Sequence, residues 1–268
     1  MSRQILIVSV HPDDMEIGMG GTVAKLVEER AEITSLVVTD GGRASNPFGW
    51  TEQRMAEVRR AEALRAAEVL GVKEVIFCDQ PDAADKVDVE AVRRKLVEVR
   101  TRLKPAEIYT LHEEFDRHPG HRLAGRLVRQ SVGESGLTPS GGVWAYEVWG
   151  PFERWDRLDY IDAYVEKKRL AIAEYRSQVA TIPYGEGVLG LNRWRAVFAD
   201  PMEDAPANSY AEASCAWPSC NRERGQSGRS LCSRNARPQK GLVRRAHSKI
   251  NQAASSFEDR ARPVRRPE

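Results

Sequence analysis

The stretch that decides the fold is ILIVSVHPDD, residues 5–14. Residues 5–10 form a short apolar run rich in β-branched side chains, which is typical of a buried strand. A histidine, a proline and two aspartates follow at once, so polar groups stand where that strand would end. The stretch therefore predicts a buried strand that brings His11, Asp13 and Asp14 to one edge of a sheet.

Strand-like and helical patterns alternate along the rest of the chain. The spacing predicts helices over residues 22–30, 51–70, 87–103, 120–132 and 160–178, and further strands over 33–39, 74–78, 106–111 and 143–149. Thr51 is placed as an N-cap and Gly71 as a C-terminal stop. We therefore expect an α/β, Rossmann-like fold with a mostly parallel sheet and helices on both faces. In such sheets ligands bind beyond the carboxyl ends of the strands.

A second polar cluster, HPGH at residues 118–121, follows the strand predicted at 106–111 and opens a helix. Each cluster alone is more often a turn or a solvated helix start, but both fall on the same predicted edge. An imidazole and a carboxylate from one loop, with an imidazole from the other, form the open three-ligand site of a catalytic zinc. The zinc would let bound water ionise near neutral pH, and the remaining aspartate could accept its proton.

Three segments carry a resemblance to a known family. HPDDMEIGMGGT, residues 11–22, resembles the first motif of the LmbE/PIG-L family of zinc-dependent N-deacetylases. HPGH at 118–121 is similar to the second motif, and residues 168–178, which end in YRSQ, resemble a later Lys…Ser-Gln segment. The resemblance spans residues 5 to about 200. It implies deacetylation of N-acetylglucosaminyl conjugates, among them precursors of mycothiol, bacillithiol and glycosylphosphatidylinositol.

The resemblance also implies a role for each matching residue. It makes His11, Asp14 and His121 the ligands of Zn²⁺ and makes Asp13 the general base. It makes His118 the electrostatic and acid partner, which would stabilise the oxyanion or protonate the leaving amine.

Two more residues and two departures complete the comparison with the family. Arg59 matches an arginine that helps to hold the substrate, and Asp82 matches an acidic contact to a sugar hydroxyl. Met15 stands where many members have glutamate, and Gly120 replaces the aspartate common between the two histidines. That aspartate could tune the first histidine of the second cluster, and Asp116 is a candidate substitute.

Other motifs favour plainer interpretations. GMGG at residues 18–21 lacks the spacing of a dinucleotide-binding loop, and its glycines more simply let a helix start approach the site. Trp144, Trp149 and Trp155 are expected in the core or at its edge rather than as platforms for a sugar ring, which is the alternative that the sequence leaves open. The cysteines after residue 213 do not have paired zinc-ligand spacing.

Composition divides the chain into two parts. Residues 214–268 hold 13 Lys and Arg against 4 Asp and Glu, whereas residues 1–213 hold 28 against 35. We expect a deacetylase domain at 1–213 and a basic, disordered or atypical tail at 214–268, with no role in binding nucleic acid. No apolar run reaches the roughly 20 residues of a membrane helix. The single cysteine of the first 200 residues, Cys78, fits a reducing compartment, so we expect a cytoplasmic protein.

Two hypotheses follow from the sequence. In the first, the chain is an enzyme that hydrolyses the acetamide of an N-acetylglucosaminyl conjugate. In the second, the departures at Met15 and Gly120 and the unusual C-terminus leave a catalytically impaired protein that binds metal and conjugate. The sequence leaves open which group is attached to the sugar and whether the chain pairs with copies of itself.

Overall fold

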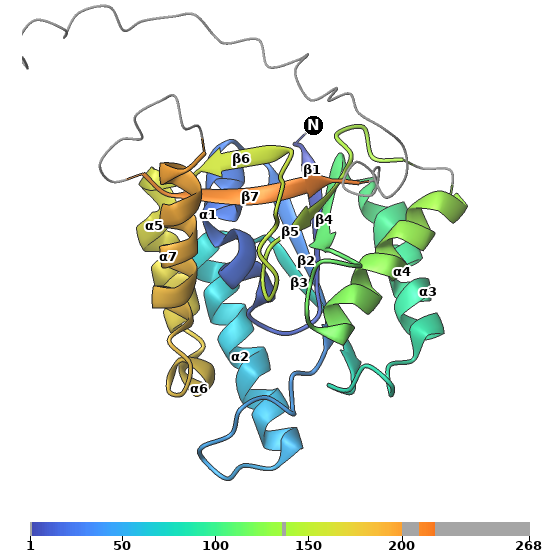
Figure 1. The fold of residues 1–268 in the computed structure, drawn as a ribbon. Coiled ribbons are helices and arrows are strands. Elements are labelled where there is room, and N and C mark those ends of the chain that lie inside the picture. Colours follow the sequence, from blue (N-terminus) through green and yellow to red (C-terminus); the bar gives the residue numbers. More distant parts are fainter. Residues whose placement is uncertain (1, 136–137, 200–208, 218–268) are drawn as a thin grey trace, which may run out of the picture. The chain divides into compact units, whose positions relative to one another are not determined.

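A seven-stranded sheet lies between two layers of helices (Figure 1). The computed structural model describes residues 2–135, 138–199 and 209–217. The elements in chain order are β1 (Gln4–Ser9), α1 (Asp14–Glu28), β2 (Glu32–Thr39), α2 (Glu52–Leu70), β3 (Glu74–Gln80), α3 (Val89–Leu103), β4 (Glu107–Leu111), α4 (Pro119–Ser135), β5 (Val143–Tyr146), β6 (Arg157–Tyr160), the 3₁₀ turn η1 (Asp162–Tyr164), α5 (Val165–Ala173), α6 (Arg176–Val179), α7 (Tyr184–Val197) and β7 (Ala211–Ala216). Within these ranges, no helix has both the length and the apolar character needed to cross a membrane.

The strand order is β3-β2-β1-β4-β5-β7-β6. Strands β1 to β5 run parallel, and β6 and β7 add an antiparallel edge next to β5. The predicted class, a Rossmann-like α/β fold with a mostly parallel sheet and helices on both faces, is confirmed. From β1 the chain adds β2 and then β3 on one side, and it then crosses back to place β4 on the other side of β1. The direction in which strands are added therefore changes between β1 and β4. A crevice at such a point is where open α/β sheets bind ligands.

Strand β1 supplies side chains to the core on both faces of the sheet. Ile5 and Ile7 pack with α1, α2 and α5, whereas Leu6 and Val8 pack with α3 and α4. This division follows from the alternation of side chains along a strand. All four side chains are buried, which fixes the register of β1 and therefore the position of the residues that follow it.

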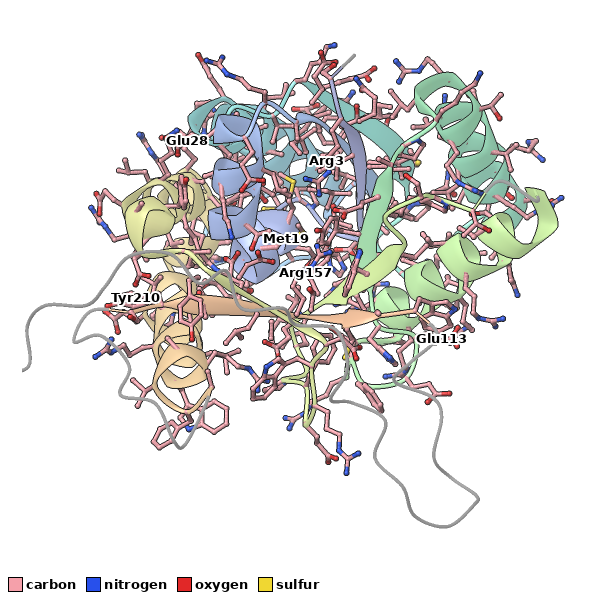
Figure 2. The ribbon with its side chains drawn as sticks, turned by 90° about the horizontal axis from the view of Figure 1, so that it is seen from above. Arg3, Met19, Glu28, Glu113, Arg157 and Tyr210 are labelled. Carbon is pink, nitrogen blue, oxygen red and sulfur yellow. The ribbon has the colours of Figure 1, made fainter. Side chains whose placement is uncertain are left out.

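Helix α1 begins earlier than the sequence predicts. The sequence predicts a loop over residues 13–21 and a helix from Thr22, but α1 starts at Asp14 and is broken at Met19, whose φ is −145° and ψ is 24°. Met19 lies toward the middle of the molecule (Figure 2). The glycines there allow close packing, because a Cβ on Gly21 would lie 2.6 Å from a carbon of Ile161. Tight packing of glycines, rather than a loop, therefore explains this sequence.

The break in α1 is capped by a residue near the other end of the described chain. The carboxylate of Glu212 on β7 accepts hydrogen bonds from the backbone N–H groups of Gly21 (3.0 Å) and Thr22 (2.6 Å). The Lys168 ammonium on α5 donates to Glu212 at 2.5 Å and to Asn192 on α7 at 2.8 Å. Lys168 and Glu212 are both buried, so each needs the other as its counter-charge.

The C-terminal half of the described chain differs most from expectation. The helix predicted over 160–178 is divided into η1, α5 and α6, and β6 and α7 are not predicted. Glycines at three positions of α7 weaken its helical signal, and contacts made by its buried residues stabilise it instead. Strand β7 continues past the boundary expected at residue 213, because Ser214 pairs with β5 and β6. The rest of the predicted tail, from residue 218, lies outside the described residues.

Replacing Glu212 by alanine is expected to lower the free energy of unfolding by about 3–5 kcal/mol. The change leaves the Lys168 ammonium buried without its counter-charge and removes the acceptor for two N–H groups. Urea-induced unfolding followed by circular dichroism measures the loss. The matched control is the double variant E212Q/K168M, which removes both charges and should lose less than E212A. A loss below about 1 kcal/mol in E212A would contradict this interpretation.

Candidate metal and active site

The loops that follow β1 and β4 meet at the carboxyl edge of the sheet. Ile7 pairs with Tyr109, so the two strands end side by side. The polypeptide leaves β1 through residues 10–14 and leaves β4 through residues 112–121, where α4 begins. The two polar clusters therefore face each other at the point where the crossovers change direction.

Three side-chain groups form a small triangle at this point. His11 Nδ1 and His121 Nε2 lie 3.1 Å apart. Asp14 Oδ1 is 3.3 Å from His121 Nε2, and Asp14 Oδ2 is 3.5 Å from His11 Nδ1. Ligand atoms that sit about 2.0–2.2 Å from a tetrahedral ion lie about 3.3–3.6 Å from one another. Asp14 has one oxygen beside each histidine, so the three side chains lie close enough together to bind one divalent metal ion.

Each histidine of the triangle is oriented by a carboxylate on its other ring nitrogen. Asp82, after β3, lies 3.2 Å from His11 Nε2. Asp116, after β4, lies 3.0 Å from His121 Nδ1. Such pairs fix the tautomer of a metal-binding histidine, so that the other nitrogen can hold the ion. The outer carboxylates therefore support the same conclusion as the distances.

The charges of the site also favour a cation. Burial lowers the pKa of His11, but the charge and hydrogen bond of Asp14 outweigh burial and raise this pKa to about 9. The pKa of His121 rises to about 10, because the charges of Asp14 and Asp116 outweigh burial in the same way. Burial would raise the pKa of Asp14, but the two histidines hold it well below its usual value. Backbone N–H groups of Val10 (3.0 Å) and His11 (2.8 Å) also donate to Asp14.

His118 stands next to the triangle but outside its short contacts. Its ring centre is 4.7 Å from those of both His11 and His121, and the ligand atoms of the three histidines lie within 4.8 Å of one another. His118 Nδ1 is buried and has no hydrogen-bond partner within the described part of the chain. Burial, followed by the charges of the other two histidines, lowers the pKa of His118. The shorter distances favour Asp14, rather than His118, as the third ligand.

Asp116 acts on His118 through its backbone N–H and through its charge. Its Oδ1 accepts the backbone N–H of His118 at 2.8 Å, and its other oxygen faces His121. The charge of Asp116 also raises the pKa of His118, although burial and the charges of His11 and His121 outweigh it, so Asp116 acts on His118 in the sense expected of the missing aspartate. A Cβ on Gly120 would lie 3.2 Å from the His118 ring, so the missing side chain leaves that ring close to the helix start.

Asp13 has an unusual backbone conformation. Its φ is 118°, which lies in the region that favours glycine. The Arg59 guanidinium on α2 donates to Asp13 Oδ2 at 2.8 Å, to the carbonyl of Gly41 at 3.1 Å and to the carbonyl of Pro12. Burial raises the pKa of Asp13 to about 6, although the charge of Arg59 opposes this shift. The carboxylate is thereby held beside the triangle without being part of it.

The structure brings all seven predicted site residues to one edge of the sheet: His11, Asp13, Asp14, Arg59, Asp82, His118 and His121. Arg59 is only 3% exposed and directs its terminal nitrogens at the turn before α1. Asp82, whose side chain is 13% exposed, faces His11. Direct contact of either residue with a substrate stays a prediction. Sequence reasoning missed the contact between Asp116 and His121, since an acid five residues before a histidine is a weak signal.

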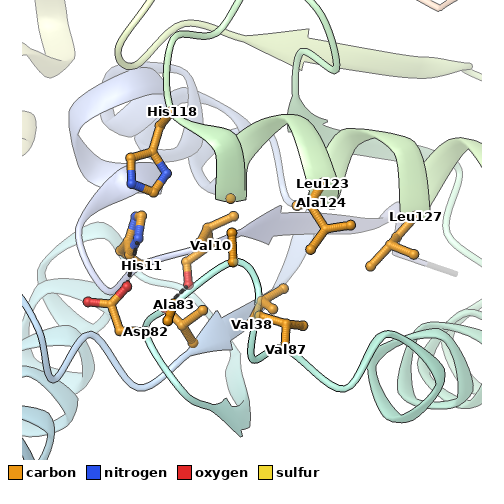
Figure 3. A pocket seen from close by; sticks show the side chains of 13 residues that line it. Val10, His11, Val38, Asp82, Ala83, Val87, His118, Leu123, Ala124 and Leu127 are labelled. Atoms are coloured by element: carbon orange, nitrogen blue, oxygen red, sulfur yellow. Dashed lines mark hydrogen bonds and ion pairs between the residues drawn. The ribbon is translucent and has the colours of Figure 1, made fainter.

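An apolar pocket opens beside His11 and His118 (Figure 3). Asp82 and the two histidines line its polar side. Its aliphatic walls come from the residue after β1, from β2, from the loop before α3 and from α4: Val10, Val38, Ala83, Ala84, Val87, Leu123, Ala124 and Leu127. A small apolar group could therefore lie next to the polar cluster.

Sequence comparisons identify relatives of this chain. The family model described as PIG-L, GlcNAc-PI de-N-acetylase, matches residues 6–132. A diacetylchitobiose deacetylase from Thermococcus kodakarensis is 32% identical over 137 residues, which cover 50% of this chain and 51% of that protein. A probable N-acetyl-alpha-D-glucosaminyl L-malate deacetylase 2 from Bacillus cereus is 30% identical over 49% of this chain and 62% of its own length. The chain thus spans about half to three fifths of the length of these curated relatives.

Solved structures resemble this chain over more of its length than the curated relatives do. A conserved protein from Thermus thermophilus is 29% identical with a TM-score of 0.65, over 79% of this chain and 93% of that one. A 4-carboxy-2-hydroxymuconate hydratase from Pseudomonas putida has a TM-score of 0.69 at 24% identity, over 85% of this chain and 100% of that one. At this identity the likeness shows the fold alone. Because a hydratase has this fold, the chemistry must be argued from the site.

The geometry predicts which residues hold the metal. Asp14→Ala and His121→Ala should each reduce the bound metal from about one ion per chain to nearly none, whereas His118→Ala should retain it. Metal content after dialysis, measured by mass spectrometry, tests this. His112→Gln is the matched control, since this buried histidine binds the backbone of residues 114 and 115 instead. Loss of metal from H118A together with its retention in D14A would reverse the assignment.

Proposed function

We propose that this chain, a member of the PIG-L/LmbE family through residues 6–132, is a zinc-dependent hydrolase. It would remove the N-acetyl group from an N-acetylglucosaminyl conjugate. The observation that carries this proposal is the triangle of His11, Asp14 and His121 with the separate carboxylate of Asp13 beside it. The triangle fits a metal ion, and the extra carboxylate is the base that amide hydrolysis needs.

Zinc suits the mixed nitrogen and oxygen donors of the triangle. When bound there, zinc would supply a Lewis acid that polarises the acetamide carbonyl and lets water ionise near neutral pH. His11, Asp14 and His121 would hold the ion, and Asp82 and Asp116 would keep the two rings in place.

Asp13 and His118 would move the protons. Hydrolysis adds water to the acetamide carbonyl and breaks its C–N bond, so that acetate and a free amine leave. Asp13, fixed by Arg59, would accept the proton of the attacking water. His118 has a buried ring nitrogen that no described residue satisfies, and it would stabilise the oxyanion or donate a proton to the leaving amine.

The apolar pocket would receive the acetyl methyl group. Its aliphatic walls lie beside His11 and His118, where the acetamide carbonyl would be bound, and they would exclude water from that side. Relatives are named for malate and inositol conjugates of N-acetylglucosamine, which are therefore the first conjugates to test. Activity on either of them would support a role in low-molecular-weight thiol biosynthesis.

The proposal predicts chelator-sensitive release of acetate. The full chain is incubated with N-acetylglucosamine, N,N′-diacetylchitobiose and the malate and inositol conjugates, and acetate and free amine are both quantified. We expect equal amounts of the two products from at least one conjugate, loss of release after chelation and recovery with zinc. Binding of the conjugates without any release would instead favour a catalytically impaired binding protein.

Asp13→Ala is expected to lower kcat by at least about a hundredfold while the metal stays bound. The variant removes the proposed base but none of the three ligand atoms. Steady-state acetate release and metal content are measured together. Asp79→Ala is the matched control. Asp79 pairs with Arg60, which neighbours Arg59 on α2, but the Asp79 side chain is exposed. Retained turnover in D13A would reject the role of Asp13.

A further inference from the structure

One tryptophan lies at the edge of the site rather than in the core. Trp149 follows β5 and is 47% exposed, so it lies at the edge of the core, where the alternative of a platform for a sugar ring stays open. Its backbone N–H donates to Asp116 Oδ2 at 3.3 Å, and the same oxygen holds His121 at 3.0 Å. A large aromatic ring is thus exposed to solvent, and Asp116 connects its backbone to His121, a proposed metal ligand.

The loop that carries Trp149 is held rigidly. Buried Glu147 accepts the backbone N–H of Phe152 at 2.5 Å and pairs with the guanidinium of buried Arg195 on α7. Gly150 packs so closely on the loop after β4 that no Cβ fits there. The loop is therefore fixed at both ends, and little conformational entropy would be lost if a ligand packed against Trp149.

Tyr184 provides a second aromatic wall. It is the first residue of α7, and its ring lies edge-on to the Trp149 ring, with 6.5 Å between the ring centres. Burial raises the pKa of Tyr184 to about 12, so its hydroxyl stays neutral near neutral pH. The two rings therefore form one aromatic pair, which the backbone of Trp149 joins to Asp116 beside His121.

We propose that Trp149 and Tyr184 form a specificity subsite for a second sugar ring, joined to the N-acetylglucosamine unit whose acetamide lies at the metal. This inference rests on the proposed function, which supplies the first sugar. An exposed indole face binds the C–H face of a pyranose, and a rigid aromatic pair offers no charge to select a carboxylate or a phosphate. The subsite discriminates substrates through binding and leaves the chemical step unchanged.

The kinetic test compares Trp149→Ala and Trp149→Phe with wild type. For N,N′-diacetylchitobiose, W149A should raise KM about fivefold and change kcat less than about twofold, whereas W149F should remain near wild type. For N-acetylglucosamine alone, KM should change less than about twofold in both variants. Trp194→Ala is the matched control, because Trp194 is 49% exposed but lies about 15 Å along α7 from Tyr184. An equal rise in KM for both sugars, or no rise for either, would overturn the subsite.

A binding test separates this inference from the proposed function. Calorimetry measures the Kd of glucosamine and of its β-1,4-linked dimer, neither of which carries an acetyl group to hydrolyse. Wild type and W194A should bind the dimer more tightly than the monomer, and W149A should lose this difference. If no conjugate releases acetate but the difference is present and depends on Trp149, the proposed function fails and the subsite stands. A dimer that binds no better than the monomer to wild type overturns the subsite, whatever the activity.

Discussion

The site depends on the hydrogen bonds of one buried guanidinium. Arg59 fixes the turn between β1 and α1, where Asp13 has a backbone conformation that costs on the order of 1–3 kcal/mol in an L-residue. The same guanidinium reaches the carbonyl of Gly41, so it ties the loop after β1 to the loop after β2. Asp14 directly follows this turn, and its place relative to His121 depends on the turn being held.

Residues 5–14, with the strand and the HPGH motif at 106–121, were enough to predict the central strand, the edge of the sheet and the meeting of the two polar clusters. They suffice because strand alternation, right-handed crossovers and the position of ligands at carboxyl ends are general constraints. The break in α1 and helix α7 could not be predicted, because contacts between residues far apart in sequence stabilise them. Glu212 with Gly21 and Arg195 with Glu147 are such contacts, and no local pattern reveals them.

The sequence located the residues of the triangle better than the groups around them. The motifs located His11, Asp14 and His121, and the structure brings them within 3.1–3.5 Å of one another. They gave no sign that Asp116 would turn toward His121 or that Trp149 would be exposed beside it. Such neighbours are what can distinguish one member of a fold from another, since the same fold also carries a hydratase.

The cap on α1 has a consequence for how the molecule is made. Glu212 is 191 residues from Gly21, so a chain emerging from the ribosome presents the histidines and aspartates of the site long before it presents the carboxylate that completes α1. Until β7 joins the sheet, two N–H groups at the break lack this acceptor and Lys168 lacks its counter-charge. The helix that carries Asp14 can therefore reach its final form only after synthesis has passed residue 212.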